Sequence, residues 1–371
     1  MQFSVSKNVL LSHLQKVSKV APTRSTMPIL NSILFELQGD NLTLRASDFE
    51  ITISSNIPVN GTVNGLIAIP SRLIYDIVNE VDEGEIYFNA KESGEIEIRA
   101  GKGKYEIMGR PGDEFPTLPD INVFNVVEIE KPNLLRLIQK TIIAVSKDEL
   151  KQALTGVLFQ IRKNEIRSVA TDGHRLVCLI RKDFISKDFE RDIIIPVKFL
   201  NLISGYLNED GKISLSIGEN HVKVEADSAV IFTRLIDERF PDYESVIPTD
   251  NDKIIKAEVT ELVATLRRVA IFANKTTHQI SIRLKEGEAA ISTVDQESRS
   301  AADENIAVEY IGDEILIGFN VDYLREIIRN IDTDKVIIKL KTPVSASLIL
   351  PEEQKENEEM LMLLMPIRLI D

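Results

Sequence analysis

Cysteine is nearly absent from the sequence, and so are the features of secreted and membrane-spanning chains. Cys178 is the only cysteine, so no disulfide can form within the chain, which is typical of a reducing cytosol. No apolar run approaches the roughly 20 residues that cross a bilayer. The first 17 residues mix lysine and polar side chains into their apolar pattern, unlike a signal peptide. We therefore expect a soluble, cytoplasmic protein with no membrane partner.

The sequence also lacks the common catalytic and metal-binding motifs. It has no GxxxxGK[ST] phosphate loop, no HExxH and no CxxC, and GKGK at 101–104 lacks the strand-to-helix setting of a phosphate loop. With one cysteine, four scattered histidines offer no zinc set: His13, His174, His221 and His278. We expect no metal, no cofactor and no catalytic residue.

What the chain does have is a repeat with a period of about 125 residues. RASD, VATD and STVD align on Asp48, Asp172 and Asp295. IAIPSRLIYDI, IIIPVKFLNLI and IGFNVDYLREI align on residues 70, 196 and 320, and a third alignment matches Phe115-Pro116, Phe240-Pro241 and Met365-Pro366. A shared period in three landmarks predicts three equivalent domains, at 1–120, 121–246 and 247–371. The polar, proline-containing joins FPTLPD and FPDYESVIPTD suit linkers.

Each domain is itself doubled. The order of a strand, a helix and three strands occurs twice in residues 1–110, with helical spacing over 7–20 and again over 71–80. The whole chain would hold six helices and about 24 strands in mostly antiparallel sheets. The expected fold class is therefore α+β.

Charge is strongly segregated along this pattern. The chain carries a net charge of −14, which taken alone disfavours a nucleic-acid partner. The six predicted helices, at 7–24, 71–79, 131–147, 197–206, 260–275 and 321–330, nevertheless carry +11 together, which leaves −25 for the remainder. If the helices lie on one side of a sheet, that side can face a polyanion. Lysine and arginine are also good formers of solvated helices, so the pattern alone leaves both explanations open.

Two segments stand out locally. ATDGHR at 170–175 could pair His174 as a base with Asp172, or form a tight turn capped by Asp172; no nucleophile motif accompanies it, and a binding role is the stronger hypothesis. The tail MLMLLMPIRLI is either the last strand of a sheet or one side of an apolar groove.

Taken together, the segments FSVSKNVLLSHLQKV, STMPIL, SVATDGHRL, ERFPDY, IGFNVDYL and LMPIRL resemble the signature segments of the bacterial sliding clamp, the beta subunit of DNA polymerase III holoenzyme. The resemblance runs from residue 3 to residue 369. It implies three processivity-fold (DNA clamp) domains per chain, each a doubled β-α-β-β-β unit, with helices lining the inside of a ring and sheets outside. It also implies a non-enzymatic, head-to-tail homodimeric ring that encircles duplex DNA without sequence specificity and is loaded by an ATP-driven clamp loader.

The resemblance further implies partners and sites. The partners are the replicative polymerase catalytic subunit, the clamp loader, and repair polymerases, mismatch-repair proteins and ligase, which insert a short apolar peptide into one pocket. That pocket would use Leu154, Thr171, Gly173, His174, Arg175, Leu176, Pro241, Val246, Asn320, Tyr323, Val344, Ala346, Leu363, Met365, Pro366, Ile367, Arg368 and Leu369. At the dimer interface, Tyr105 and Ile107 should meet Ile271 and Phe272 of the other chain.

The DNA-facing residues come from two arguments. Arg24, Arg72 and Lys198 match family positions, and the charge pattern adds Lys7, Lys16, Lys19, Arg136, Lys140, Lys147, Arg267, Arg268 and Lys275. The sequence departs from the family at Val197, at Ala346, in the acidic segment 351–359 and in the terminal Ile370-Asp371. The last two put access to the pocket in question. A DNA-modifying enzyme and a repeat scaffold that binds only proteins are the competing hypotheses.

Overall fold

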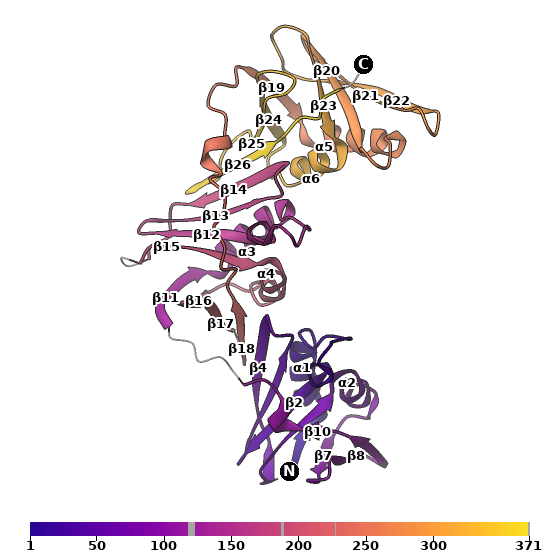
Figure 1. Cartoon of the computed structure of the whole chain (residues 1–371), viewed down its shortest axis with the longest axis vertical. Helices are drawn as coiled ribbons and strands as arrows, with labels where there is room; N and C mark the ends of the chain where they lie inside the picture. The colour runs from indigo at the N-terminus through magenta and orange to yellow at the C-terminus, as the bar shows by residue number, and fades with distance from the viewer. Residues whose placement is uncertain (118–122, 187–188, 227, 370–371) are drawn as a thin grey trace. The chain divides into compact units, whose positions relative to one another are not determined.

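The computed structural model describes residues 1–117, 123–186, 189–226 and 228–369 (Figure 1). The Ile370-Asp371 extension and part of the first predicted join lie outside the described residues. Residues 1–132 and 198–235 form one compact unit, and residues 133–197 and 236–371 form a second. Each unit is described separately below.

Six α-helices occur in the described residues, two in each repeat, as predicted. They are α1 Lys7–Val17, α2 Ser71–Glu80, α3 Lys131–Thr141, α4 Val197–Ser204, α5 Val259–Val269 and α6 Val321–Arg329. Each follows a strand directly and is followed by three strands, so the doubled strand-helix-three-strand plan is confirmed in all three repeats. The first repeat contains two short strands besides, β5 Asn60–Val63 and β10 Arg110–Pro111, so the described residues hold 26 strands where about 24 were predicted. In α1, Leu10, Leu14 and Val17 are buried at helical spacing, which leaves the lysines on the solvated face.

The first unit contains two antiparallel sheets. The five-stranded sheet has the order β5 Asn60–Val63, β1 Gln2–Ser6, β7 Glu85–Ala90, β8 Glu95–Ala100 and β9 Gly103–Met108. The nine-stranded sheet has the order β10 Arg110–Pro111, β6 Gly65–Pro70, β2 Ser32–Gln38, β3 Asn41–Ser47, β4 Ile51–Pro58, β18 Ala229–Arg234, β17 His221–Ala226, β16 Lys212–Gly218 and β11 Val123–Glu130. Helices α1 and α2 lie side by side and contact strands of these sheets (Figure 1).

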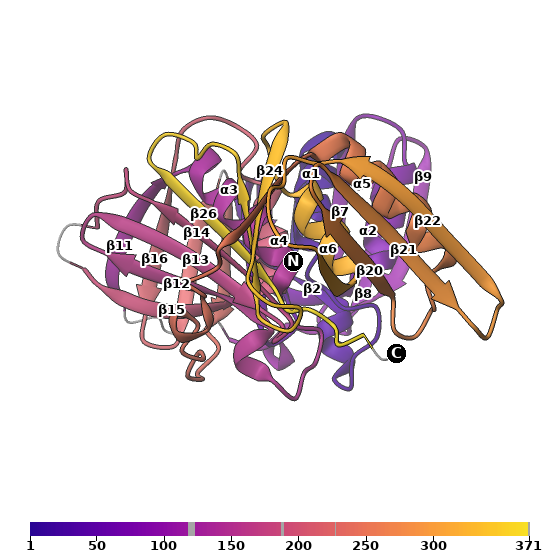
Figure 2. The ribbon, with the colours of Figure 1, turned by 90° about the horizontal axis from the view of Figure 1, so that it is seen from above.

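The second unit also contains two antiparallel sheets. The eight-stranded sheet has the order β15 Arg191–Pro196, β12 Gly156–Arg162, β13 Glu165–Thr171, β14 Arg175–Arg181, β26 Glu358–Leu364, β25 Ser347–Pro351, β24 Lys335–Leu340 and β19 Lys253–Glu258. The four-stranded sheet has the order β22 Ser300–Ala307, β21 Glu288–Asp295, β20 Gln279–Lys285 and β23 Ile315–Asn320, with β22 as an outermost strand (Figure 2). Helices α5 and α6 pack against each other and against these strands.

The largest sheets are shared between consecutive repeats. In the nine-stranded sheet β4 pairs with β18, so that Ile53 lies opposite Ile231. In the eight-stranded sheet β14 pairs with β26, so that Val177 lies opposite Met362. Because hydrogen-bonded sheets cross from repeat to repeat, the two compact units do not coincide with the three repeats. The domain limits at 120 and 246 remain predictions.

The first helix of each repeat ends earlier than predicted. Helix α1 ends at Val17, α3 at Thr141 and α5 at Val269, and only short 3-10 turns follow the last two. The predicted helices over 7–24, 131–147 and 260–275 are therefore too long at their C-terminal ends. In α3 the Thr141 hydroxyl donates to the Leu137 carbonyl at 2.6 Å, and such back-bonding competes with regular helix continuation.

One of the three repeat landmarks is also wrong. Cross-strand pairing identifies equivalent residues of the repeats. In each repeat, the row of paired residues that starts four residues before the first helix crosses four strands. The row ends at Tyr105 in β9, at Ile231 in β18 and at Met362 in β26. The counterpart of Met365, three residues further on, is therefore Arg234 in the second repeat and not Phe240. The step of 125 residues from Pro241 to Pro366 therefore does not join equivalent positions of the fold. The alignments on Asp48 and on residue 70 agree with the strand pairing.

Candidate functional site

The ATDGHR segment forms the tight turn between β13 and β14. Asp172 Oδ1 accepts hydrogen bonds from the backbone N–H groups of His174 at 2.9 Å and Arg175 at 3.0 Å. Gly173 has a φ of +91°, a conformation that glycine adopts without strain. Thr171 Oγ1 accepts from the Gly173 N–H at 3.1 Å and donates to the Arg175 carbonyl at 2.6 Å. The capped-turn hypothesis for Asp172 is therefore confirmed.

Arg175 projects from this turn into a cluster of charged and aromatic groups. Its Nε donates to Asp172 Oδ2 at 3.1 Å, and its Nη1 donates to Glu326 Oε2 at 2.5 Å. The guanidinium carbon lies 4.3 Å from the centroid of the Tyr323 ring, which is itself stacked 6.2 Å from the His174 ring. Burial raises the pKa of the Tyr323 phenol, and Asp172 raises it further. The turn of the second repeat is thereby tied to helix α6 of the third.

The chain after β26 runs across this cluster. The Met365 N–H donates to the His174 carbonyl at 2.8 Å, and the Ile367 N–H donates to the Gly318 carbonyl at 2.8 Å. A Cβ at Gly318 would lie 2.5 Å from the Ile367 carbonyl oxygen and 2.7 Å from Leu369, so this approach requires glycine. The hypothesis of a last strand is confirmed for the tail, because β26 Glu358–Leu364 closes the third repeat. Residues 365–369 extend past it beside the turn, and their place in an apolar groove stays a prediction.

Asn320 begins helix α6. Its side-chain oxygen accepts from the backbone N–H groups of Asp322 at 3.0 Å and Tyr323 at 3.1 Å, which is the geometry of a helix N-cap. Asn320 therefore sets where the helix starts and how Tyr323 is presented. The sequence analysis names Asn320 as a repeat landmark and a pocket residue but not as a helix cap, although an Asn before VDYL is a typical N-cap signal.

An apolar surface adjoins the turn. Leu176 lies opposite Leu363, and Leu363 lies opposite Leu348, so three leucines form one row across β14, β26 and β25. They belong to a buried cluster that also holds Tyr243, with Ala346 packed against it. Beside these buried side chains, several predicted pocket residues expose apolar surface: Val246 54%, Val344 56% and Met365 39%.

The segment 236–247 covers part of the same sheet face and supplies residues that the sequence prediction missed. Phe240 and Tyr243 are in edge-to-face contact at 6.4 Å, and the Tyr243 hydroxyl donates to Gln160 Oε1 at 2.6 Å. Burial raises the pKa of Tyr243 to about 12, so its phenol stays protonated as a donor. The RFPDY motif was the available signal, but only Pro241 of it was predicted. Glu326 was missed as well, since nothing in the sequence joins it to Arg175.

The acidic segment 351–359 connects β25 and β26 at the end of the strands opposite to Met365. Within it, Gln354 donates to the Met360 carbonyl and accepts from the Met360 N–H, at 2.9 and 2.8 Å. Lys355 lies 3.1 Å from Asp332. Because these contacts hold the segment at the far end of the strands, it does not extend over residues 363–369.

Most of the basic residues predicted to face DNA are accessible. Those classed as exposed are Lys19, Arg24, Arg72, Lys147, Lys198, Arg267, Arg268 and Lys275, while Lys7 and Lys16 are partly buried. Lys198 pairs with Asp48, and Arg268 pairs with Glu304 at 2.5 Å. Arg24, Lys147 and Lys275 do not belong to helices; each lies on the loop that follows the first helix of its repeat.

Arg136 and Lys140 are less accessible, and both are paired with carboxylates inside the chain. This pairing disfavours a DNA-facing role for both residues. Arg136 donates to Glu358 through Nε at 2.6 Å and Nη2 at 2.5 Å, and its Nη1 lies 2.6 Å from Asp332. Lys140 Nζ donates to Asp332 at 2.7 Å and to the Asn330 carbonyl at 2.5 Å. The helix itself contains no acid, so these cations seemed unpaired, but both carboxylates come from the third repeat.

The predicted interface residues lie on two edge regions. Tyr105 is 37% exposed and belongs, with Ile107, to β9, which pairs only with β8 among the described strands. Ile271 is 76% exposed and Phe272 39%, beside β22, which pairs only with β21 among the described strands. The Phe272 carbonyl accepts from Ser300 Oγ at 3.4 Å. Apolar side chains at two unpaired strand edges are the features that interfaces bury.

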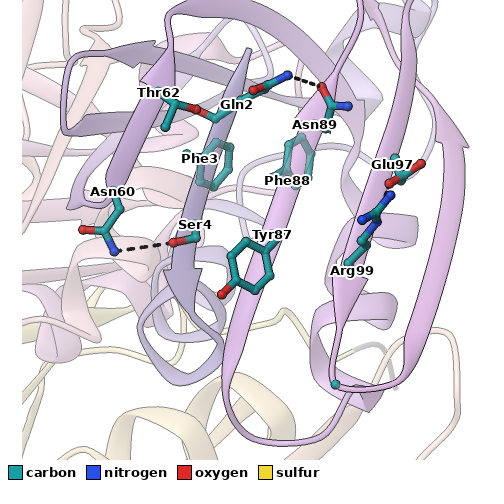
Figure 3. A pocket seen from close by; sticks show the side chains of 11 residues that line it. Gln2, Phe3, Ser4, Asn60, Thr62, Tyr87, Phe88, Asn89, Glu97 and Arg99 are labelled. Carbon is teal, nitrogen blue, oxygen red and sulfur yellow. Dashed lines mark hydrogen bonds and ion pairs between the residues drawn. The ribbon is translucent and has the colours of Figure 1, made fainter.

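A hollow that the sequence did not predict lies on the outer face of the five-stranded sheet (Figure 3). Its volume is about 630 Å³. Gln2 donates to Asn89 at 3.2 Å, Asn60 donates to Ser4 at 3.4 Å, and Tyr87 lies opposite Ser4 on the neighbouring strand. Among the described residues that line the hollow, none pairs a nucleophile with a base.

No group of three or more His, Cys, Asp or Glu side chains in the described part of the chain is arranged to hold a metal ion. None of the helices within the described ranges has both the length and the apolar composition needed to traverse a bilayer.

Comparisons with known proteins agree with this geometry over the whole chain. Models of the N-terminal, central and C-terminal domains of the DNA polymerase III beta subunit match residues 1–119, 128–242 and 244–368. The "Beta sliding clamp" of Haemophilus influenzae is 30% identical over 374 residues, and that of Pseudomonas aeruginosa is 29% identical over 372, with all of each chain covered.

Solved structures give the same result. The DNA polymerase III subunit beta of Pseudomonas aeruginosa has a TM-score of 0.93 at 28% identity, and the DNA polymerase sliding clamp of Bacillus subtilis has 0.93 at 26%, each covering both chains fully. The fold is therefore that of the sliding clamps of DNA replication, which are processivity factors and not catalysts. Within that class, the chain belongs to the family of bacterial DNA polymerase III beta subunits.

Proposed function

We propose that this chain pairs head to tail with a second copy to form a closed ring around duplex DNA, and that the ring tethers the replicative polymerase through the surface beside Met365. The observation that carries the proposal is the rule by which its repeats join. The first repeat joins the second by pairing β4 with β18, and the second joins the third by pairing β14 with β26. Among the described strands, the counterparts that keep one unpaired edge are β22 in the third repeat and β9 in the first.

The internal pairing also supplies a register for the proposed seam. Ile53, Val177 and Ala302 are counterparts, because each lies opposite the residue two positions before the turn aspartate of its repeat. Tyr105, Ile231 and Met362 are counterparts as well. Each is the last residue of a row of paired residues that crosses four strands and begins four residues before the first helix of its repeat. Since Ile53 faces Ile231 and Val177 faces Met362, Ala302 should face Tyr105 of the second copy.

This register has favourable chemistry. It sets Tyr105 opposite the small side chain of Ala302, close to Phe272, so that the tyrosine ring and the predicted apolar contacts lie on one face of the strands. On the other face it sets Lys104 opposite Asp303, a pair of opposite charge. Both strands lose an exposed edge when they pair. A nine-stranded sheet would result, of the same size as the sheet shared by the first two repeats.

For DNA, the proposal assigns the exposed basic residues of the helices and of the loops after them. Arg24, Lys147 and Lys275 lie at equivalent places in the three repeats, so the closed ring would present each of them twice around its opening. Ring closure retains DNA by topology, so these contacts need only be loose and directed at phosphates, which suits sliding.

For proteins, the proposal assigns the apolar surface of Val246, Val344 and Met365 together with the residues of the turn at 171–176. Apolar peptides from the polymerase, the clamp loader, repair polymerases, mismatch-repair proteins and ligase would bind there in turn. Aliphatic and methionine side chains suit such shared use, because they adapt to different partners. The ring would bind DNA and these partners in the bacterial cytoplasm, at the replicating nucleoid.

The test is processive synthesis on a primed circular template with the replicative polymerase and the clamp loader. Addition of this protein should lengthen the products made in one binding event. A variant with Arg24→Glu and Lys198→Glu should load more slowly, because like charge repels the duplex, while its affinity for an apolar partner peptide stays the same. Equal product lengths with and without the protein would reject the proposal.

A further inference from the structure

Arg175 is almost completely enclosed, and its charge is balanced inside the chain. The side chain is 8% exposed, and Asp172 beside it is 12% exposed. A buried guanidinium needs carboxylates to offset its lost hydration. Arg175 is therefore not free to pair with a charged group of a partner, and its role has to come from what it holds in place.

Asp172 offers only one of its two oxygens to the Arg175 guanidinium. One of its carboxylate oxygens, Oδ1, is occupied by the two backbone N–H groups of the turn, which leaves Oδ2 for the guanidinium at 3.1 Å. Glu326 supplies the second carboxylate at 2.5 Å. Glu326 is half exposed and, among the hydrogen bonds of the described residues, contacts the turn through the Arg175 side chain and not through its backbone, so its contact with Arg175 can be removed without unmaking the turn.

Glu326 and Tyr323 lie three residues apart on α6 and therefore on one face of that helix. The guanidinium contacts both, because its Nη1 donates to the carboxylate and its carbon lies over the tyrosine ring, 4.3 Å from the ring centroid. A guanidinium fixed at its edge is held over the ring, where the cation–π attraction is strongest. The Tyr323 ring in turn lies against His174, whose carbonyl binds Met365.

We infer that Glu326 is a positioning residue of the peptide-binding surface: it locks Arg175 over Tyr323 and so fixes the spacing between the turn of the second repeat and helix α6 of the third. The inference rests on the proposed peptide-binding function of this surface. Glu326 itself touches no partner in this scheme. It lowers the cost of binding by holding Tyr323, His174 and Met365 in one arrangement before the peptide arrives.

The experiment measures binding of a fluorescein-labelled ten-residue peptide, with Leu, Leu and Phe at its centre and serines around them, by fluorescence anisotropy. Glu326→Gln keeps the shape of the side chain and removes its charge. We expect it to weaken binding about tenfold, the size typical of one charge-assisted hydrogen bond. Glu326→Asp should restore part of the affinity. Glu353→Gln, on the exposed part of the acidic segment, is the matched control and should bind like the parent.

A double-mutant cycle tests whether Glu326 acts through Arg175. In an Arg175→Met background, Glu326→Gln should cause almost no further loss, because the guanidinium it orients is gone. In calorimetry, Glu326→Gln should lower the melting temperature by no more than about 4 °C, because Glu326 is half exposed, which separates positioning from general destabilisation.

The outcomes separate this inference from the proposed function. If the parent binds the peptide and Glu326→Gln binds it equally well, or if the two substitutions are additive, the positioning role is rejected and the binding surface stands. If the parent does not bind the peptide at all, the proposed function of the surface fails first.

Discussion

Removing the charge of Glu358 should destabilise the second unit far more than removing that of its neighbour Glu359. The Glu358 side chain is 1% exposed, and it accepts both hydrogen bonds of the bidentate Arg136 pair together with one from Arg181 at 3.3 Å. Glu359 points the other way along β26, is 55% exposed and pairs with Lys182. The two residues thus provide a matched pair of Glu→Gln substitutions at adjacent positions of one strand.

The magnitude follows from what each substitution leaves behind. Loss of one member of a buried ion pair typically costs about 3–5 kcal/mol, because the other charge stays buried without compensation. Arg136 keeps Asp332 and Arg181 keeps Asp183, so about 3 kcal/mol is expected for Glu358→Gln. An exposed pair contributes below about 1 kcal/mol, which is the expectation for Glu359→Gln.

Scanning calorimetry converts these values into melting temperatures. For a unit of about 200 residues, 1 kcal/mol corresponds to about 2–4 °C, so Glu358→Gln should lower the transition by about 6–12 °C and Glu359→Gln by less than about 4 °C. Equal, small shifts for both variants would refute the reasoning, since they would mean that the charges around Glu358 are solvated in solution.

Three further predictions address other parts of the molecule. Burial raises the pKa of Asp332, but the hydrogen bonds from the cations around it outweigh burial and hold the pKa below its usual 3.8. The ionised carboxylate therefore stabilises the fold above that pH, and this contribution is lost as the pH falls below it. The free energy of unfolding should therefore fall between about pH 5 and about pH 3, and Asp332→Asn should flatten this dependence. Met365→Ala with Leu176→Ala should weaken peptide binding at least about tenfold while sedimentation still shows dimers; unchanged affinity would remove this surface from the proposal. Ile271→Asp with Phe272→Asp should yield monomers, because the seam would bury unpaired charge, and intact dimers in sedimentation would reject the seam.

The repeated order of strands and helices could be predicted from the sequence because it is encoded in local residue patterns. Strand and helix periodicity, and the aspartate turns at Asp48 and Asp172, recur in each repeat, and these signals depend only on neighbouring residues. The ends of helices were less predictable. Lys19, Arg24, Lys147 and Lys275 were assigned to helices, but each lies beyond the C-terminal end, where the chain turns away.

Contacts between distant segments were the part that the sequence could not supply. Arg136 and Lys140 looked like free cations, since their own helix contains no acid, yet Asp332 and Glu358 reach them from about 190 and 220 residues away. Glu326 was missed for the same reason, because its partner Arg175 lies 151 residues earlier. Long-range pairing of this kind depends on the sheet that joins β14 to β26, and only the folded chain reveals it.

The central claim is that two copies close around duplex DNA, and the dependence of binding on DNA topology tests it most directly. The protein is loaded onto nicked circular DNA with the clamp loader and ATP, the complex is isolated by gel filtration, and half of it is then cut once with a restriction enzyme. The account predicts that the protein stays with the intact circles and leaves the linear molecules by sliding off their ends. Equal retention on circular and linear DNA would contradict encirclement, as would a failure to stay on the circles.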